Sequence, residues 1–341
     1  MLSNRNPALD QLRSLAALAV VWLHVAASVV VRSPDVHSLA WWLGNLSDAA
    51  SRWCVPVFMM ISGALLLGHD APALPPLTFL RRRYLRLAVP GLFWTLLYLA
   101  VAASDSTPLT LDDTRHNLFN GTPWYHLWYL YMLFGLYLVT PALRSLVQCC
   151  DHRQLRHLIA ASFVAGSIEV LVLHRGESFF LLRCLPLLGY FLAGHYLFVT
   201  ARNHLPGVSA RRLLVLIAGC ILLVALGTAW LLPTMGLRAC ALMYAWENPL
   251  VIAMSLAVFS LLLRCAGTAP LGQPLERLAP LSFGIYLLHP LWLLGLANLG
   301  LTAWRWHPAL GIPLLTLLTI ALSALTVHLM RRFSLLRRVV S

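Results

Sequence analysis

The stretch LDQLRSLAALAVVWLH (Leu9–His24) opens an apolar run that reaches about residue 31 and carries ionisable side chains within it. A run of this length crosses the hydrocarbon core of a bilayer as a helix. Arg13 and His24 are eleven residues apart, so a helix places them within about 20° of one face and about 16 Å apart along its axis. Asp10 lies one turn before Arg13 on that face. Because ionisable groups inside a membrane turn toward protein or water, this face is the first candidate for a functional site.

The whole chain has the composition of a membrane protein. Of its 341 residues, 60% are hydrophobic and only 11% are charged, and the mean hydropathy is +0.76. A soluble domain carries roughly 25% charged residues. A soluble globular protein, a disordered chain and a small disulfide scaffold are therefore excluded.

Ten apolar stretches follow one another along the chain, and we expect each to cross the membrane as a helix. They are residues 14–31, 41–67, 87–103, 124–143, 158–173, 179–199, 213–232, 244–263, 281–303 and 309–330. The predicted fold class is an all-α polytopic membrane protein with about ten transmembrane helices. Residues 1–341 are expected to form a single integral-membrane domain without a fused soluble domain. An alternative with eight crossings would make two of the weaker stretches re-entrant.

The basic residues, all of which are Arg, give the orientation. With the N-terminus inside, most of them fall in cytoplasmic segments, among them Arg5 and Arg202, whereas the loop 104–123 carries Asp105, Asp112 and Asp113. The positive-inside rule therefore predicts that the N- and C-termini are both cytoplasmic. The arginines form short runs and no basic face interleaved with aromatic residues, so nucleic acid is not an expected partner.

A basic segment, Arg81-Arg82-Arg83-Tyr84-Leu85-Arg86, precedes the third apolar stretch. It can simply anchor the helix at the cytoplasmic surface. As a binding site, Arg83 and Arg86 share a helical face and can grip phosphates together with Arg82.

Charged and aromatic residues elsewhere in the apolar stretches are weaker candidates. Asp48 and Arg52 are spaced to form an ion pair within a helix, whereas Glu169 has no local partner. His126 and Trp128 lie in YHLWYL (Tyr125–Leu130), and His289 lies in SFGIYLLHP (Ser282–Pro290). Aromatic residues near the ends of membrane helices usually form interfacial belts, and a single His in such a helix is more often structural than catalytic.

Several other chemistries lack their motifs in this sequence. Its seven Cys show neither metal-site nor disulfide spacing. We find no H-x4-D acyltransferase spacing, P-loop, G-x-S-x-G elbow or H-E-x-x-H zinc pair. We therefore expect no metal and no permanently bound cofactor.

Five phrases together resemble the acyltransferase-3 family of bacterial membrane O-acyltransferases. They are LDQLRSLAALAVVWLH (Leu9–His24), VPVFMMISGALL (Val55–Leu66), FLRRRYLRLAVP (Phe79–Pro90), YHLWYL (Tyr125–Leu130) and LSFGIYLLHP (Leu281–Pro290). Within the family, SRWCVPVFMMISG (Ser51–Gly63) is similar to the enterobacterial common antigen O-acetyltransferase type.

The resemblance implies a ten-span core that takes an acyl group, expected to be acetyl, from cytoplasmic acyl-CoA as donor substrate. The acceptor would be a hydroxyl of a cell-surface or lipid-linked glycan. The family's R-x10-H element maps onto Arg13 and His24 as catalytic residues, and its R-x-x-R element maps onto Arg83 and Arg86. The remaining substrate-binding candidates are Arg82, Asp10, His126, Trp128, Glu169 and His289.

The sequence leaves two roles open for His24, which is either the general base for the acceptor hydroxyl or an acyl-imidazole carrier. Arg13 can pair with Asp10, bind a phosphate or stabilise the oxyanion of the tetrahedral intermediate. Other function classes also fit the composition, namely an exporter of glycans or lipid-linked sugars that transfers no acyl group and a structural subunit of a polysaccharide-synthesis complex.

Overall fold

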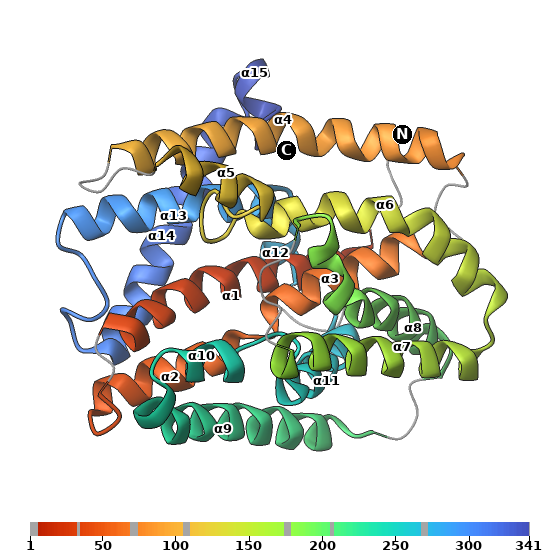
Figure 1. Ribbon diagram of the computed structural model, residues 1–341, viewed down its shortest axis with the longest axis horizontal. Helices are drawn as coiled ribbons and strands as arrows, with labels where there is room; N and C mark the ends of the chain where they lie inside the picture. Colours follow the sequence, from red (N-terminus) through yellow and green to blue (C-terminus); the bar gives the residue numbers. More distant parts are fainter. Residues whose placement is uncertain are drawn as a thin grey trace. The chain divides into compact units, whose positions relative to one another are not determined.

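The computed structural model describes residues 6–32, 35–68, 74–104, 110–173, 179–204, 208–266 and 272–340 (Figure 1). Within these ranges the chain is helical and contains no strand. Arg5 and Asp105, which entered the orientation argument, lie outside the described residues, as does the side chain of Arg202.

Nine helical segments of the described chain are long and apolar enough to cross a membrane. They are Pro7–Arg32 (α1), Leu39–Leu66 (α2, Leu39–Ser51, and α3, Cys54–Leu66), Pro76–Ala103 (α4), Trp128–Cys149 (α6), His152–Val172 (α7, His152–Ser167, and η1, Ile168–Val172), Leu182–Val199 (η2, Leu182–Leu187, and most of α8, Leu188–His204), Ala210–Met235 (α9), Gly272–Asn298 (α12, Gly272–Leu278, η3, Ala279–Leu281, and α13, Ser282–Asn298) and Pro308–Met330 (α14).

A tenth apolar helix, α11 (Pro249–Cys265), has 17 residues. Each of the ten predicted stretches overlaps one of these segments, so the prediction of an all-α polytopic membrane protein is confirmed. Three short helices complete the described chain: α5 (Leu111–Phe119), α10 (Arg238–Met243) and α15 (Ser334–Arg337).

The second membrane segment is broken in the middle, between α2 and α3. Pro56 explains the break, because its ring clashes with the carbonyl four residues earlier and it has no N–H to donate. That carbonyl belongs to Arg52, where α2 ends. The break therefore sets Arg52 at a helix end inside the membrane segment.

The chain divides into two compact units, each made of two separate parts of the sequence. The first unit comprises Met1–Ala64 and Tyr190–His328, and the second comprises Leu65–Gly189 and Leu329–Ser341. The division into two compact units does not test whether residues 1–341 form one integral-membrane domain, which stays a prediction.

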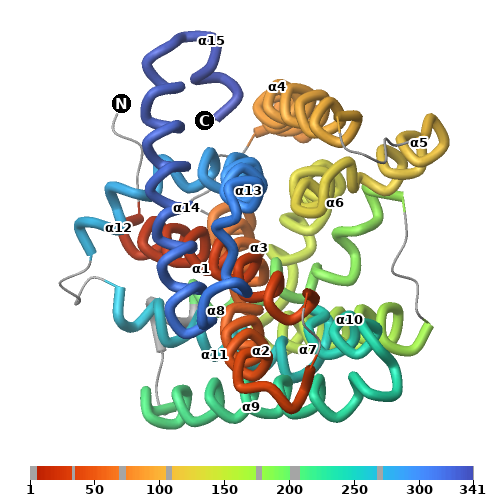
Figure 2. Tube along the Cα trace, turned by 90° about the vertical axis from the view of Figure 1, so that its left-hand side faces the viewer, coloured from red at the N-terminus to blue at the C-terminus, as the bar shows by residue number. Residues whose placement is uncertain are grey.

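In the first unit, α1 contacts α2, α11, α12 and α13, and α9 lies beside α2 and α11 (Figure 2). Two glycines bring α3 and α8 into backbone contact. A Cβ on Gly63 would lie 1.8 Å from the carbonyl oxygen of Phe191, and one on Gly194 would lie 2.1 Å from that of Met60. Close crossings of this kind are built from small residues in membrane proteins.

In the second unit, α4 packs against α6, which in turn contacts η2. The last described residues lie on α4, because Trp94 donates a hydrogen bond of 2.8 Å from Nε1 to the carbonyl of Val339. Val339 and Val340 are both buried. This anchor holds the C-terminal segment against α4.

Candidate functional site

The polar face predicted on the first membrane helix lies on one uninterrupted helix, α1. Near its start, Arg13 Nη1 donates to Asp10 Oδ1 at 3.4 Å, and both side chains are partly exposed. Arg13 thus pairs with Asp10, which is one of the three roles that the sequence left open for this guanidinium.

The face between Arg13 and His24 is closed. Ala17 and Val20, which follow the same stripe of α1, are 1% and 4% exposed. Ser28, one turn beyond His24, donates its hydroxyl to the carbonyl of Val25 at 2.6 Å. A polar route from the Arg13 end of α1 to His24 therefore cannot follow this face of the helix and would have to run along other helices.

His24 meets a second histidine from a distant part of the sequence. Its ring stacks on that of His289 in α13, with the ring centroids 5.2 Å apart and the planes 22° apart. His24 is half-buried, whereas His289 is fully buried. The structure therefore brings together two of the candidates that the sequence had singled out separately.

The proline that follows His289 explains how its imidazole is held. Pro290 has no N–H, so the carbonyl of Tyr286, four residues earlier, lacks its helical donor. His289 Nδ1 lies 2.7 Å from that carbonyl oxygen. Since a carbonyl can only accept, Nδ1 carries the proton, and in the neutral ring Nε2 is the basic nitrogen. The His-Pro dipeptide thus fixes the tautomer of the buried ring.

A buried apolar cluster lies beside this histidine pair, and the ring centroid of Tyr286 is 6.3 Å from that of His289. Val20, Leu23 and Cys54 form a buried cluster, and Trp53 and Tyr286 pack against it. A largely apolar environment strengthens the electrostatic interactions of any charge that forms there. The arrangement suits proton transfer by an imidazole whose orientation is fixed.

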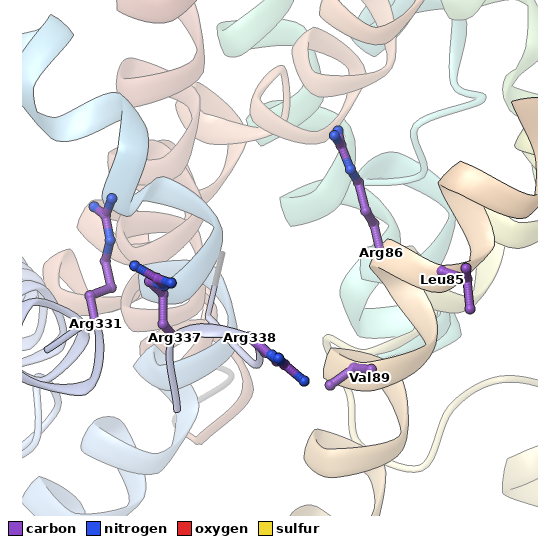
Figure 3. Close-up of a pocket in the computed structure, with 6 residues that line it drawn as sticks. All are labelled: Leu85, Arg86, Val89, Arg331, Arg337 and Arg338. Atoms are coloured by element: carbon purple, nitrogen blue, oxygen red, sulfur yellow. The ribbon is translucent and has the colours of Figure 1, made fainter. Parts of the chain in front are cut away.

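The second unit holds a cavity of about 470 Å³ lined by four arginines. Arg86 contributes from α4, and the C-terminal segment contributes Arg331, Arg337 and Arg338. Figure 3 shows the three C-terminal side chains opposite α4, with Arg338 directed toward Val89. None of the four forms an ion pair with a carboxylate in the described chain. Four positive charges without a carboxylate partner among the described residues favour the binding of an anion in this cavity.

Sequence reasoning missed the three C-terminal arginines as site residues and used them only to assign the orientation. The anchor between Trp94 and Val339 is what brings them to Arg86. A hydrogen bond between an indole and a backbone carbonyl 245 residues away leaves no pattern in a single sequence.

Arg83 lies in different surroundings from Arg86. Its guanidinium is 5.5 Å from the ring centroid of Phe79 and 5.6 Å from that of Tyr137, a geometry of cation–π attraction. The expectation that Arg83 and Arg86 grip one ligand from a shared face is thus modified, because aromatic rings hold Arg83 while Arg86 lines the cavity. Arg82 is exposed and is not part of the cavity lining.

The other candidates of the second unit lie in separate local settings. His126 is buried, with its ring centroid 5.0 Å from that of Tyr98. Trp128 is half-buried, at the first position of α6, and packs edge-on against Tyr129. Glu169 lies in the π-helical turn η1, half-buried, with no ion pair to a described residue.

The predicted ion pair between Asp48 and Arg52 is present. Arg52 Nη2 lies 2.5 Å from Asp48 Oδ1 and 2.7 Å from Oδ2. The Asp48 side chain is only 1% exposed. Among the described residues, no group of three or more His, Cys, Asp and Glu side chains is arranged to hold a metal ion.

Comparison with known proteins identifies a family. A family model described as an acyltransferase domain matches residues 6–328, from the start of α1 to near the end of α14, and includes His24, His289 and Arg86. No curated protein and no solved structure matches the chain.

Proposed function

The chain belongs to this acyltransferase family, and on that premise we propose that it transfers an acyl group from cytoplasmic acyl-CoA to a hydroxyl of a cell-surface or lipid-linked glycan. The acyl group proposed first is acetyl, in line with the similarity of Ser51–Gly63 to the enterobacterial common antigen type. The location proposed is the bacterial inner membrane.

The stacked pair of His24 and His289 is the observation that supports this proposal most directly. In one step, the His24 imidazole takes the proton of the acceptor hydroxyl, and the hydroxyl oxygen attacks the thioester carbonyl. The tetrahedral intermediate then expels the CoA thiolate, which receives the proton from the His24 imidazolium. Atoms and charge balance, and the products are the ester and free CoA.

His289 acts as a positioning residue in this proposal. Its ring is held by the Tyr286 carbonyl and lies against the ring of His24. A fixed neighbouring plane limits the rotation of His24 and keeps a ring nitrogen aimed at the reacting hydroxyl. In the two-step alternative, His24 itself carries the acyl group as an acyl-imidazole, and the same positioning serves both routes.

The four-arginine cavity is the proposed site for the donor phosphates. CoA carries several phosphate groups, and guanidinium groups bind phosphate through paired, charge-assisted hydrogen bonds. Arg331, Arg337 and Arg338 thus join Arg86 of the family's R-x-x-R element as donor-binding residues.

Replacement of His24 tests the proposed function. The assay uses purified protein, radiolabelled acetyl-CoA and a panel of glycans, and it scores both labelled product and free CoA. We expect His24→Ala to lose at least about 100-fold in transfer rate, the low end of what a general base contributes, while the protein still inserts and folds.

The exposed His157 of α7 provides a matched control, and His157→Ala should transfer at the wild-type rate. Product at the wild-type level from His24→Ala would end the assignment of His24. Movement of a glycan across vesicles without release of CoA would instead identify an exporter.

A further inference from the structure

The buried ion pair of Asp48 and Arg52 calls for an explanation beyond stability. Taking two charges out of water costs several kcal/mol each, and apolar residues of similar volume are often as stabilising. Ionisable residues within a membrane segment most often serve a function. This pair lies at the break between α2 and α3, and the proposed catalytic mechanism does not use it.

A cavity of about 290 Å³ opens directly onto this pair. Its walls come from α1 through Ala27 and Val30, from α2 through Asp48 and Arg52, and from α10 and the segment after it through Ala241 and Tyr244. Its volume is near the lower limit for ligand sites, which are about 300–1,000 Å³. A small ligand or a single unit of a larger one matches this size.

The polar groups of the cavity are held in place. The Arg52 guanidinium lies over the ring of Tyr244, 4.3 Å from its centroid. The Tyr244 hydroxyl donates to Asn45 Oδ1 at 2.5 Å.

One donor of the pair remains available. Arg52 Nε is buried and makes no hydrogen bond to a described residue, although both oxygens of Asp48 contact its Nη2. A buried N–H without an acceptor is unfavourable because it has lost its hydrogen bond to water. A ligand that brings an oxygen to this position would remove that penalty.

These walls have the chemistry that recognises a sugar ring. A sugar presents hydroxyl groups around its edge and C–H groups on its faces. Planar charged side chains pair with the hydroxyl groups, and aromatic rings cover the apolar faces. The cavity provides both kinds of group, with Arg52 and Asp48 as the charged pair and Tyr244 and Trp246 as the aromatic residues.

The cavity also lies next to the proposed catalytic residue. Ala27 follows His24 by three residues on α1, which is about 4.5 Å along the helix axis and away from the Arg13 end. Trp53, the residue after Arg52, packs against the buried cluster that contains Val20 and Leu23 of α1. A hydroxyl of a ring seated in the cavity can thus approach His24.

We propose that this cavity binds one saccharide unit of the acceptor glycan and presents its hydroxyl group to His24. The inference rests on the proposed acyl transfer for its role in catalysis, but the binding of a saccharide can be tested without the donor. The contacts assigned to the sugar are the Asp48–Arg52 pair and the aromatic faces of Tyr244 and Trp246.

Two variants test the site. Ala241 is exposed and lines the cavity, so Ala241→Trp fills it without entering the core. Arg52→Lys keeps the charge but loses the planar fork. Binding is measured by saturation-transfer NMR with the methyl glycosides of N-acetylglucosamine, glucose, galactose and rhamnose, in the absence of acyl-CoA. We expect wild-type protein to bind at least one glycoside and both variants to lose at least tenfold in affinity.

Matched controls carry the same changes elsewhere. Ala142→Trp alters an exposed alanine of α6, and Arg115→Lys alters the exposed ion pair with Asp112 on α5. Both controls should bind like wild type. In the transfer assay, Ala241→Trp should raise the KM for the acceptor about tenfold and leave the KM for acyl-CoA within twofold.

The outcomes separate this inference from the proposed function. Wild type that binds a glycoside through this cavity but transfers no acyl group would overturn the acyl transfer and support the saccharide site. Ala241→Trp that binds glycosides like wild type would overturn the saccharide site and leave the acyl transfer standing. Failure of wild type to bind any of the four glycosides would overturn it as well.

Discussion

A proline and a histidine together show how single residues shape the site. In an ordinary helix the N–H of residue 290 would donate to the carbonyl of Tyr286. Pro290 removes that donor, and His289 Nδ1 takes its place at 2.7 Å. The pair is local, yet it determines which ring nitrogen is basic next to His24.

Pro290→Ala separates this role from a structural one. The restored N–H competes for the Tyr286 carbonyl and weakens the hold on His289, so we expect kcat to fall about tenfold, equivalent to about 1.4 kcal/mol. Proline inside a helix is unfavourable by up to about 3 kcal/mol relative to alanine, so the unfolding temperature should rise. Nitrogen-15 NMR of the imidazole reports the tautomer. A higher unfolding temperature with unchanged kcat and tautomer would contradict the positioning role.

At this scale the sequence singled out His24 and His289 but did not show that their rings meet. His24 was recognisable from its spacing to Arg13, and His289 from the phrase around it. Their stacking joins α1 to α13, and such a long-range contact is not visible in one sequence. Arg83 differs from expectation for the same reason, because Tyr137 lies on another helix.

At the scale of the helices, the distance between two neighbouring helices depends on where small residues let their backbones come into contact. Apolar runs predicted the membrane segments because the bilayer requires continuous apolar length. The break between α2 and α3 was not predicted, although Pro56 marks it in the sequence. The crossing of α3 and α8 depends on two glycines 131 residues apart in the chain, and no local pattern identifies such a pair.

Gly194→Ala should destabilise the crossing of α3 and α8. The new methyl group would lie 2.1 Å from the carbonyl oxygen of Met60 and 2.3 Å from its Cα, and a backbone cannot yield as a side chain does. Overpacking of this kind costs about 1–3 kcal/mol or more, so we expect a clear fall in unfolding temperature in detergent. Gly219→Ala is the control, since a Cβ at Gly219 in α9 meets nothing within 4 Å. It should be neutral or stabilising, and equal loss in both variants would contradict the close crossing.

For the molecule as a whole, the arginine cavity bears on the number of membrane crossings. Arg86 lies in the first half of α4, just before its apolar part, and Arg331 lies just after α14, yet both line one cavity of the second unit. They must then lie on the same side of the membrane, which requires an even number of crossings from α4 through α14. That number is even only if α11 crosses as well, although its 17 residues span only about 26 Å. The cavity thus supports ten crossings over nine.

The same cavity yields a prediction about the donor. The double variant Arg337→Gln with Arg338→Gln removes two of the four guanidinium groups of the cavity. We expect the KM for acetyl-CoA to rise about tenfold. The kcat should change little, because the phosphates of CoA lie far from the reacting thioester. The rise of this KM with salt should also be smaller than in wild type, since exposed charges are screened.

A matched variant, Arg211→Gln with Arg212→Gln, removes an exposed arginine pair at the start of α9 and should leave both constants unchanged. The 3′-phosphate provides a further check. Acetyl-CoA without that phosphate should bind more weakly to wild type but lose less affinity in the Arg337/Arg338 double variant, because coupled contacts are not additive. Equal losses in all three proteins would show that the phosphates bind elsewhere and that the positive charge of the C-terminal segment serves only to orient the chain.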